Sequence, residues 1–340
     1  MSTVKNFMRE YKGERPSMRM NKLKRKKKNR IRILLLSLTI MIAAAAIYLY
    51  SVWNSMQNAI DTMHEDRKTD KRESEISLKE KHPFSVLILG VDERENDVGR
   101  SDTMIVVTVN PDKNSIKMLS IPRDTRVNIV GWSGGEDKIN HSYAYGGIDM
   151  SIDTVEEFLD IPIDYYIKLN MEGFKDLVDA VGGVTVYNDM DLQHGKYVFP
   201  KGEITLNGEE ALVYSRIRYE DPRGDFGRQK RQKDIMQAIL NEGASISTLW
   251  NYDDIFEALS KNIKTNLTFN EMVEIQAGYK STVKNLEQYN FEKGSGGFLG
   301  NIWYYFPDEQ EVLDFQHMLK EHLGLLPESG VAVNDHENGA

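Results

Sequence analysis

The longest apolar run of the chain lies near its N-terminus. Residues 33–53 are 21 consecutive positions without a charged side chain. A helix of this length, rising about 1.5 Å per residue, crosses a hydrocarbon core of about 30 Å. Tyr48, Tyr50 and Trp53 lie at its far end, where aromatic rings with a polar edge prefer the membrane interface. The pattern predicts a single transmembrane helix, and its length favours an uncleaved signal anchor over a cleaved signal peptide.

Short apolar runs alternate with helical patterns through the rest of the chain. Strands are predicted at residues 84–90, 104–109, 115–121, 165–169, 184–187 and 288–292. Helices are predicted at residues 149–159, 172–181, 226–240, 249–261, 270–280 and 308–323, with one more opening at 207–210. A turn at residues 110–114 predicts a hairpin of the second and third strands. The alternation predicts an α/β fold, a layered α-β-α extracellular domain with a central mixed sheet.

Composition divides the chain into five parts. We expect residues 1–32 to form a basic cytoplasmic tail and residues 33–53 to form the transmembrane signal anchor. Residues 54–82 are charged and poor in large apolar side chains, so we expect an extracellular stalk there. Residues 83–327 hold the periodic segments of the folded domain, and residues 328–340 form a polar tail that we expect to be disordered.

Charge differs on the two sides of the apolar run. Residues 1–32 hold 13 Lys and Arg against 2 Asp and Glu, a net charge of +11. The whole chain holds 43 Lys and Arg and 52 Asp and Glu. Subtraction leaves 30 basic and 50 acidic residues after position 32, a net charge of −20 there. Because basic residues beside a span stay in the cytoplasm, we expect a single-pass type II membrane protein whose C-terminal domain lies outside the cell. The chain has no cysteine, so disulfides and thiolate metal sites are excluded.

Residues 211–234 concentrate positive charge within the acidic domain. The segment holds five arginines, namely Arg216, Arg218, Arg223, Arg228 and Arg231. In an extended segment Arg216 and Arg218 point to one face, and on a helix Arg228 and Gln232 share a face. Converging guanidinium groups suit phosphate oxygens, because each donates two parallel hydrogen bonds and keeps its charge. A surface ion-pair network with neighbouring acidic side chains explains the same cluster equally well.

Two aspartates flank the first two predicted strands. Asp92 follows the first strand and Asp102 precedes the second. Ligands of α/β sheets gather in loops beyond strand ends, so the two carboxylates could share a divalent cation. Mg²⁺ takes one or two carboxylates and completes its shell with water and phosphate oxygens. The capping of a turn explains either aspartate without a metal.

Arg123 lies at the end of the third predicted strand. A turn in which Asp124 pairs with a neighbouring arginine is an alternative explanation of Asp124 and Arg126, and less so of Arg123. No GxxxxGK[ST], HExxH or GxSxG motif occurs, so P-loop kinase, zinc protease and serine hydrolase functions lack support.

Residues 137–147 are predicted as a glycine-bounded loop. Lys138, Asn140 and His141 are candidates there for the lining of a cleft. A single histidine among polar residues is more often a hydrogen-bonded structural group, so His141 is not expected to act as a base.

Six ordered motifs between about residues 84 and 242 resemble the LytR-CpsA-Psr family. They are GVD at 90–92, RSDTM at 100–104, SIPRDT at 120–125, DKINHSYAYGG at 137–147, AVGGV at 180–184, and YSRIR with GDFGRQKRQ within 214–232. A single-span anchor with an external domain is also similar to that family. The resemblance implies a phosphotransferase that moves an anionic glycopolymer, such as wall teichoic acid or capsule, from a polyprenyl-pyrophosphate carrier to peptidoglycan.

The resemblance also implies roles for individual residues. Asp92 and Asp102 would hold Mg²⁺ or Mn²⁺. The pyrophosphate would be bound by Arg100, Arg123, Arg216, Arg218, Arg228 and Gln232. Asp102, Arg123 and Arg218 would be catalytic, with Asp102 as the candidate acceptor for the proton of the attacking hydroxyl. Residues 243–340 match the family less specifically and carry no functional expectation.

Other function classes need the same cationic groups. A lipid-pyrophosphate hydrolase would use water in place of the sugar hydroxyl. A polyprenyl-phosphate-binding or regulatory membrane protein would bind without catalysis. No nucleic-acid partner is expected, because only residues 1–32 would face the cytoplasm. A polyprenyl tail needs an apolar groove, for which residues 174–181 and 235–240 are candidates, although most of these side chains are expected in the core.

Overall fold

The computed structural model describes residues 16–67, 71–72, 76–93, 99–243 and 252–326. It divides into two compact units, Met1–Asn54 and Ser55–Ala340. Helix α1 (Pro16–Met63) begins in the first unit. Within it, Lys26–Met63 is long and apolar enough to cross a membrane, with a hydropathy of 2.3 in its most apolar window. The predicted tail at residues 328–340 lies outside the described residues.

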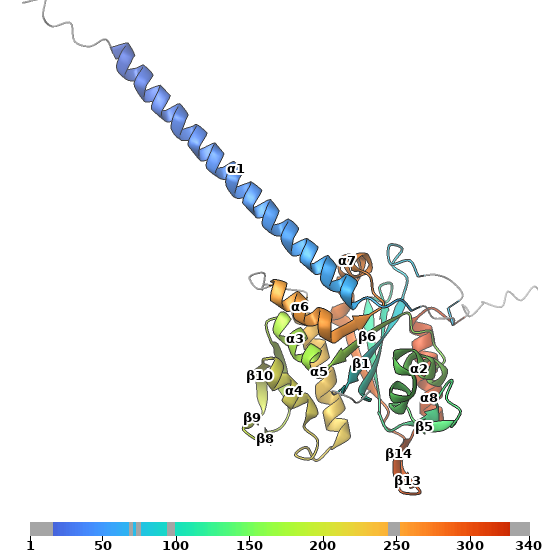
Figure 1. Cartoon of the computed structure of the whole chain (residues 1–340). Coiled ribbons are helices and arrows are strands. Elements are labelled where there is room, and N and C mark those ends of the chain that lie inside the picture. Colours follow the sequence, from blue (N-terminus) through green and yellow to red (C-terminus); the bar gives the residue numbers. More distant parts are fainter. Residues whose placement is uncertain (1–15, 68–70, 73–75, 94–98, 244–251, 327–340) are drawn as a thin grey trace, which may run out of the picture. The chain divides into compact units, whose positions relative to one another are not determined.

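A six-stranded mixed sheet forms the centre of the second unit, in the order β11-β6-β1-β2-β3-β12 (Figure 1). Its strands are β1 (Phe84–Val91), β2 (Ser101–Asn110), β3 (Ser115–Ile121), β6 (Tyr165–Asn170), β11 (Ile263–Thr265) and β12 (Leu286–Asn290). Strand β2 runs antiparallel to β1 and β3, as the predicted hairpin requires. Strands β6 and β12 pair in parallel with β1 and β3, so the sheet is mixed, as predicted.

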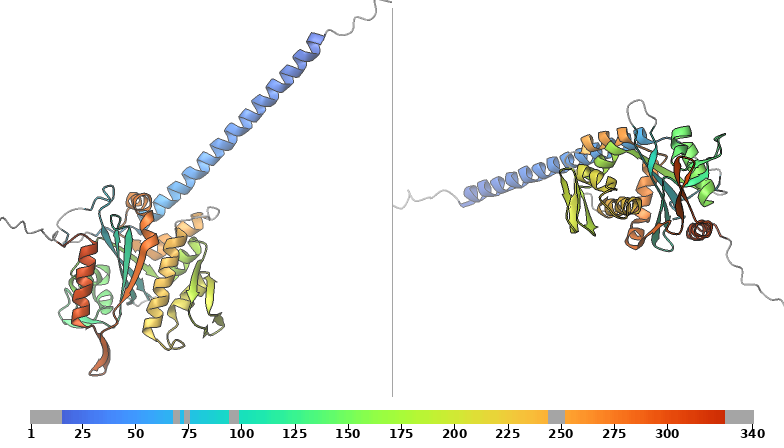
Figure 2. Two further views of the ribbon diagram at one scale, coloured as in Figure 1. Left: turned by 180° about the vertical axis from the view of Figure 1, so that it is seen from behind. Right: turned by 90° about the horizontal axis from the view of Figure 1, so that it is seen from below.

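Both faces of the sheet are covered, which explains the continuous apolar runs of its central strands. Leu87 and Leu89 of β1 pack on one face with α2 (His141–Leu159) and α8 (Glu309–His322). Val86 and Ile88 alternate to the other face, against α5 (Asp225–Gly243) and α7 (Phe269–Gly278). Figures 1 and 2 show the resulting three layers, with α2 and α8 on the side opposite α5.

A third apolar cluster lies beyond α5 and joins it to a set of short elements. They are α3 (Met171–Ala180), β7 (Val184–Asn188), β8 (Leu192–His194), β9 (Tyr197–Phe199), β10 (Gly202–Leu206) and α4 (Gly208–Arg216). Asn207 starts α4 with a capping box, accepting from the backbone of Glu210 while the Glu210 side chain bonds back. The remaining described elements are β4 (Arg126–Asn128), β5 (Glu136–Lys138), α6 (Tyr252–Asn262), η1 (Lys280–Asn285), β13 (Ser295–Leu299) and β14 (Ile302–Phe306).

Two segments in which no helix or strand was predicted are regular in the structure. Helix α2 begins at His141, inside the predicted loop 137–147, and kinks at Gly146 and Gly147. Gly147 has a φ of 68°, which glycine adopts without strain. The two glycines interrupt the helical sequence pattern, so the turns before the kink were not predicted as a helix. The glycine-rich segment after residue 292 forms the β13–β14 hairpin.

The segment predicted as a stalk packs on the domain instead. Ala59, Ile60 and Met63 are buried against the sheet with the core residues of β1 and α7. Further on, Arg72 donates to both carboxylate oxygens of Asp164, at 2.6 and 2.9 Å. The few apolar side chains of residues 54–82 therefore belong to the core, which composition alone did not reveal.

Candidate active site

A cavity of about 570 Å³ lies where β1, β2 and the loop after β3 meet α3, α4 and α5. Ile88 and Ile105 contribute to its wall from the sheet face opposite α2 and α8. The volume falls within the range of about 300–1,000 Å³ that is typical of ligand sites. Segments far apart in the sequence thus converge on one space.

Four arginines line this cavity, together with Gln232. They are Arg123 after β3, Arg216 at the end of α4, Arg218 two residues on, and Arg228 on α5. Ile217 between the second and third is buried, so the flanking side chains point to the cavity as an extended segment predicts. The cavity therefore has a wall of guanidinium groups that can donate paired hydrogen bonds to phosphate oxygens.

Asp92 and Asp102 line the same cavity. Nη1 of Arg123 donates to Oδ1 of Asp102 at 2.8 Å. Among the described residues no group of three or more His, Cys, Asp or Glu side chains could hold a metal. Two hard carboxylates fit Mg²⁺ or Mn²⁺ only if water and phosphate oxygens of a substrate complete the shell, and this is the way Mg²⁺ is commonly bound.

Burial shapes the charge of two of the arginines. Burial lowers the pKa of Arg228, and the neighbouring Asp225, 2.5 Å from Nη2, only partly offsets this effect. Burial also opposes the charge of Arg123, but the carboxylates of Asp102 and Asp124 raise its pKa overall. The Nε atoms of both arginines are buried without a hydrogen-bond acceptor in the described part of the chain. Protein acceptors therefore do not saturate the donors of this wall.

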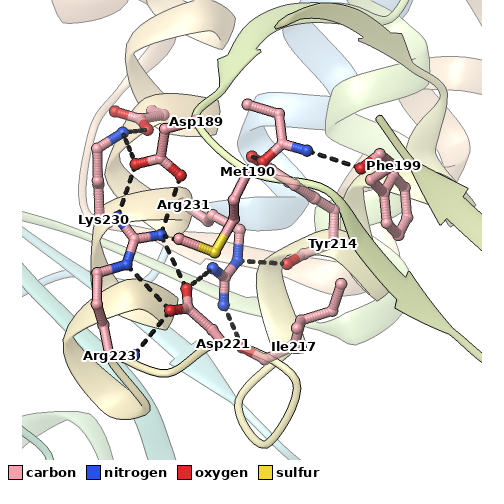
Figure 3. A network of polar contacts seen from close by, with 11 residues as sticks. Asp189, Met190, Phe199, Tyr214, Ile217, Asp221, Arg223, Lys230 and Arg231 are labelled. Carbon is pink, nitrogen blue, oxygen red and sulfur yellow. Dashed lines mark hydrogen bonds and ion pairs between the residues drawn. The ribbon is translucent and has the colours of Figure 1, made fainter. Parts of the chain in front are cut away.

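Two other arginines of the basic segment serve a structural network (Figure 3). Arg223 binds Asp221 at 2.9 Å and Asp189 at 2.6 Å. Arg231 is buried, and donates to Asp221 and to the backbone carbonyl of Ile217. The network fixes the loop between α4 and α5, which carries Arg218. The ion-pair explanation of the basic segment thus accounts for Arg223 and Arg231, whereas Arg228, although paired with Asp225, lines the cavity with Arg216 and Arg218.

Apolar side chains form the rest of the cavity lining. They are Ile88, Ile105, Leu169, Phe174, Leu212, Val213 and Met236. Of the two candidate groove helices, only Phe174 and Met236 reach the cavity, whereas Val178, Ile235 and Ile239 are core residues, as expected. The anion-binding wall therefore opens onto a surface that can accept a lipid chain.

Several candidate residues lie elsewhere. Arg100 is exposed and is absent from the cavity lining, so its role stays a prediction. Arg126 lies in β4 and pairs with Glu136 of β5 at 2.5 Å, rather than with Asp124 in a turn. Lys138 pairs with Asp124 at 2.7 Å. The expectation that Lys138, Asn140 and His141 line a cleft is not met, because none of them borders the cavity.

His141 is instead held by a carboxylate hub. Asp137 accepts from Nδ1 of His141 at 2.8 Å and from the hydroxyls of Tyr145 and Tyr304 at 2.6 and 3.1 Å. Burial acts against the Asp137 carboxylate, but the hydrogen bonds from Tyr145, His141 and the backbone N–H of Lys138 prevail and lower its pKa to about 2. The structural interpretation of His141 is therefore confirmed.

Sequence reasoning missed some cavity residues. Asn170 lies at the end of β6, and His194 and Glu220 approach from β8 and from the loop after α4. Nδ1 of His194 lies 2.7 Å from a carboxylate oxygen of Glu220. None of these residues stands in a motif, so only the tertiary fold shows that they border the site.

The fold and the cavity define a three-layer α/β protein with an anion-binding wall beside an apolar surface. Residues 49–321 match the LytR_cpsA_psr family. The chain belongs to this family, which confirms the resemblance of its motifs.

Individual relatives agree with this assignment. A protein of Bacillus subtilis (strain 168), named polyisoprenyl-teichoic acid–peptidoglycan teichoic acid transferase TagU, is 50% identical over 277 residues, which are 81% of this chain and 90% of that protein. The crystal structure of B. subtilis TagU matches with a TM-score of 0.58 and 50% identity over 72% of this chain and 97% of that chain. A structure described as TagT bound to LIIa-WTA matches with a TM-score of 0.67 and 35% identity over 76% of this chain and 97% of that chain.

Proposed function

We propose that this chain is a membrane-anchored transferase that moves an anionic cell-wall glycopolymer, of the wall teichoic acid type, from a polyprenyl-pyrophosphate carrier to peptidoglycan. The observation that carries the proposal is the convergence of four arginines, two aspartates and an apolar lining in one cavity. The name of the B. subtilis relative, a teichoic acid transferase, supports the same activity.

The basic wall and the apolar wall of the cavity bind different parts of the donor substrate. Arg123, Arg216, Arg218 and Arg228, with Gln232 beside them, bind the pyrophosphate. The apolar side chains receive the first units of the polyprenyl tail. On a domain with excess negative charge, the basic wall confines attraction for an anion to the site itself.

Asp92 and Asp102 would hold the divalent cation, Mg²⁺ or Mn²⁺. When bound, the cation neutralises charge on the phosphate oxygens as a Lewis acid.

Transfer begins when a hydroxyl of a peptidoglycan sugar attacks the phosphorus that carries the glycopolymer. The new P–O bond forms as the bond to the bridging oxygen breaks, and polyprenyl phosphate leaves with the electron pair. Asp102 accepts the proton of the hydroxyl, and the product is a phosphodiester between glycopolymer and peptidoglycan. The arginines supply alignment and charge stabilisation, which dominate phosphoryl transfer.

The topology that suits this reaction places the domain outside the cell. The basic residues before the apolar run keep the N-terminus in the cytoplasm. The cavity then lies on the side where peptidoglycan is assembled. Protection of the domain from protease in intact spheroplasts would contradict this topology.

The test is a transfer assay with the full chain in detergent and a labelled lipid-linked glycopolymer. With peptidoglycan present, we expect label to move into insoluble material, with one polyprenyl phosphate released for each chain transferred. Release of polyprenyl phosphate at an equal rate without peptidoglycan would instead identify a hydrolase. Binding of the lipid without any product would identify a binding protein.

A further inference from the structure

A second, smaller cavity of about 120 Å³ lies beside the loop after β3. Its polar lining residues are Asp124, Asp225 and Gln229, and its aromatic lining residues are Phe226, Trp303 and Tyr305. No basic side chain is among the described residues that line it. An anion is therefore disfavoured, and a purely apolar ligand would leave Oε1 of Gln229, which is buried without a hydrogen-bond partner in the described part of the chain, unsatisfied.

The register of the β13–β14 hairpin extends this aromatic surface outward. Phe298 lies opposite Trp303, and Gly296 lies opposite Tyr305. Residues two apart on a strand share a face, so Tyr305, Trp303 and Phe298 form one aromatic stripe from the cavity to the exposed part of the hairpin. Trp303 is 38% exposed and Phe298 is 73% exposed. Figure 1 shows the hairpin projecting from the body of the domain.

Glycine at position 296 is needed for this arrangement. A Cβ atom there would lie 2.5 Å from Cζ2 of Trp303, so the indole ring occupies the space that a side chain would fill. The hairpin is also fixed to the site, because the backbone N–H of Tyr305 donates to the carbonyl of Asp124 at 2.9 Å. The position of the aromatic stripe is thus fixed relative to the loop after β3, which carries Arg123.

Charged pairs join the linings of the two cavities. Asp124 lies 3.6 Å from Nε of Arg123, and Asp225 lies 2.5 Å from Nη2 of Arg228. A ligand in the second cavity would therefore sit next to the arginines that bind the pyrophosphate. Aromatic faces beside carboxylate and amide groups suit a sugar ring, because its C–H face is apolar and its hydroxyls need hydrogen-bond partners.

We propose that the second cavity and the aromatic stripe bind the acceptor, as the uncharged hexosamine rings of a peptidoglycan glycan strand. This inference rests on the proposed transferase function. The sugar of the donor is already held through its phosphate in the first cavity. A polymeric acceptor needs a surface that continues beyond the site, and the stripe from Tyr305 to Phe298 provides one.

The experiment uses soluble, uncross-linked peptidoglycan strands as acceptor with the full chain in detergent. The variants are Trp303→Ala and Phe226→Ala, which remove aromatic rings from different elements, and Trp303→Phe, which keeps a ring. Tyr187→Ala is the matched control, since Tyr187 is 62% exposed on β7 and lines neither cavity. We expect each alanine variant to raise the acceptor KM about tenfold with an unchanged donor KM. We expect partial recovery in Trp303→Phe, no effect in the control, and an unchanged melting temperature in Phe226→Ala.

The outcomes separate this inference from the proposed function. If the wild-type chain transfers and both alanine variants keep its acceptor KM, or change donor and acceptor KM equally, the acceptor surface is refuted while the transferase stands. If the wild-type chain transfers nothing, calorimetry with the same strands decides. Binding that Trp303→Ala abolishes would support the surface and refute the transferase, and no binding would refute both.

Discussion

Arginines of one short segment differ in function because they differ in partners. The side chain of Arg218 is 37% exposed, and the carboxylate of Asp225 lies 4.0 Å from its Nε. The side chain of Arg231 is 2% exposed and is bound by Asp221. A buried ion pair is costly to break, whereas an exposed guanidinium contributes little to stability.

Exchanging each of these arginines separately should therefore give opposite results. We expect Arg218→Ala to abolish transfer and leave the melting temperature nearly unchanged. Arg231→Ala should lower the free energy of unfolding by about 3–5 kcal/mol, because Asp221 would keep, among the described residues, Arg223 alone as an ionic partner. Transfer assays and thermal unfolding of both variants provide the measurement. A loss of stability in Arg218→Ala that matches its loss of activity would make this arginine structural.

The metal proposal is tested at Asp92. Asp92→Asn keeps the shape of the side chain and removes a charged ligand, so we expect a weaker affinity for Mg²⁺. We expect a higher Kd for Mg²⁺ in calorimetric titration and a higher Mg²⁺ concentration for half-maximal transfer. Asp112→Asn, in the exposed turn between β2 and β3, is the control. An identical dependence on Mg²⁺ in the two variants would show that Asp92 does not bind the cation.

At the scale of elements, a buried histidine joins helix α8 to the sheet. Nδ1 of His322 lies 2.8 Å from Oγ1 of Thr108 on β2, and Nε2 lies 2.9 Å from Oγ of Ser115 on β3. Burial, together with the nearby Lys117 and Lys113, lowers its pKa to about 4. The imidazole is therefore neutral in the folded domain at pH values where it would be charged in the unfolded chain.

This difference predicts how stability depends on pH. Between about pH 4 and the ordinary pKa of 6.5, the unfolded chain binds one more proton at His322 than the folded domain does. The contribution of the neutral His322 to the free energy of unfolding is therefore complete above pH 6.5 and is lost as the pH falls towards 4. We expect the melting temperature to fall over this range, with a loss of about 1–3 kcal/mol attributable to this group. His322→Gln should flatten the profile. Equal slopes in wild type and variant would contradict the assignment.

The accuracy of the sequence predictions also varies by element. The strands that became β1, β2 and β3 were predictable, because long apolar runs buried on both faces leave few alternatives. The β13–β14 hairpin was missed, since the glycine-rich sequence of β13 becomes a strand only by pairing with the aromatic β14. Convergence of the arginines followed from family motifs, whereas His194 and Glu220 stand in none and needed the fold.

At the scale of the whole molecule, the second unit begins before the predicted domain boundary at residue 83. Ala59, Ile60 and Met63 belong to the core, and Leu78 is buried with them. Each fully buried apolar side chain of this kind contributes about 1.5–3 kcal/mol, somewhat less for alanine. Residues 55–82, which follow the apolar run, therefore contribute to the free energy of unfolding of the domain.

Truncation tests this boundary. A soluble chain that begins at Ser55 should keep the melting temperature of the domain, whereas one that begins at Pro83 should lose several kcal/mol of unfolding free energy. Thermal and denaturant unfolding of the two chains provide the comparison. Equal stabilities would show that residues 55–82 contribute nothing to the core.

The pairing of β3 with β12, and of the Asp124 loop with Tyr305, also sets an order of assembly. Synthesis delivers the anchor and the first three strands early, but their C-terminal neighbours come last. Contacts between such distant segments form slowly. The site that holds Arg123 is therefore completed only after nearly the whole polypeptide has emerged, and a nascent chain that stalls before residue 286 would be tethered yet unfinished.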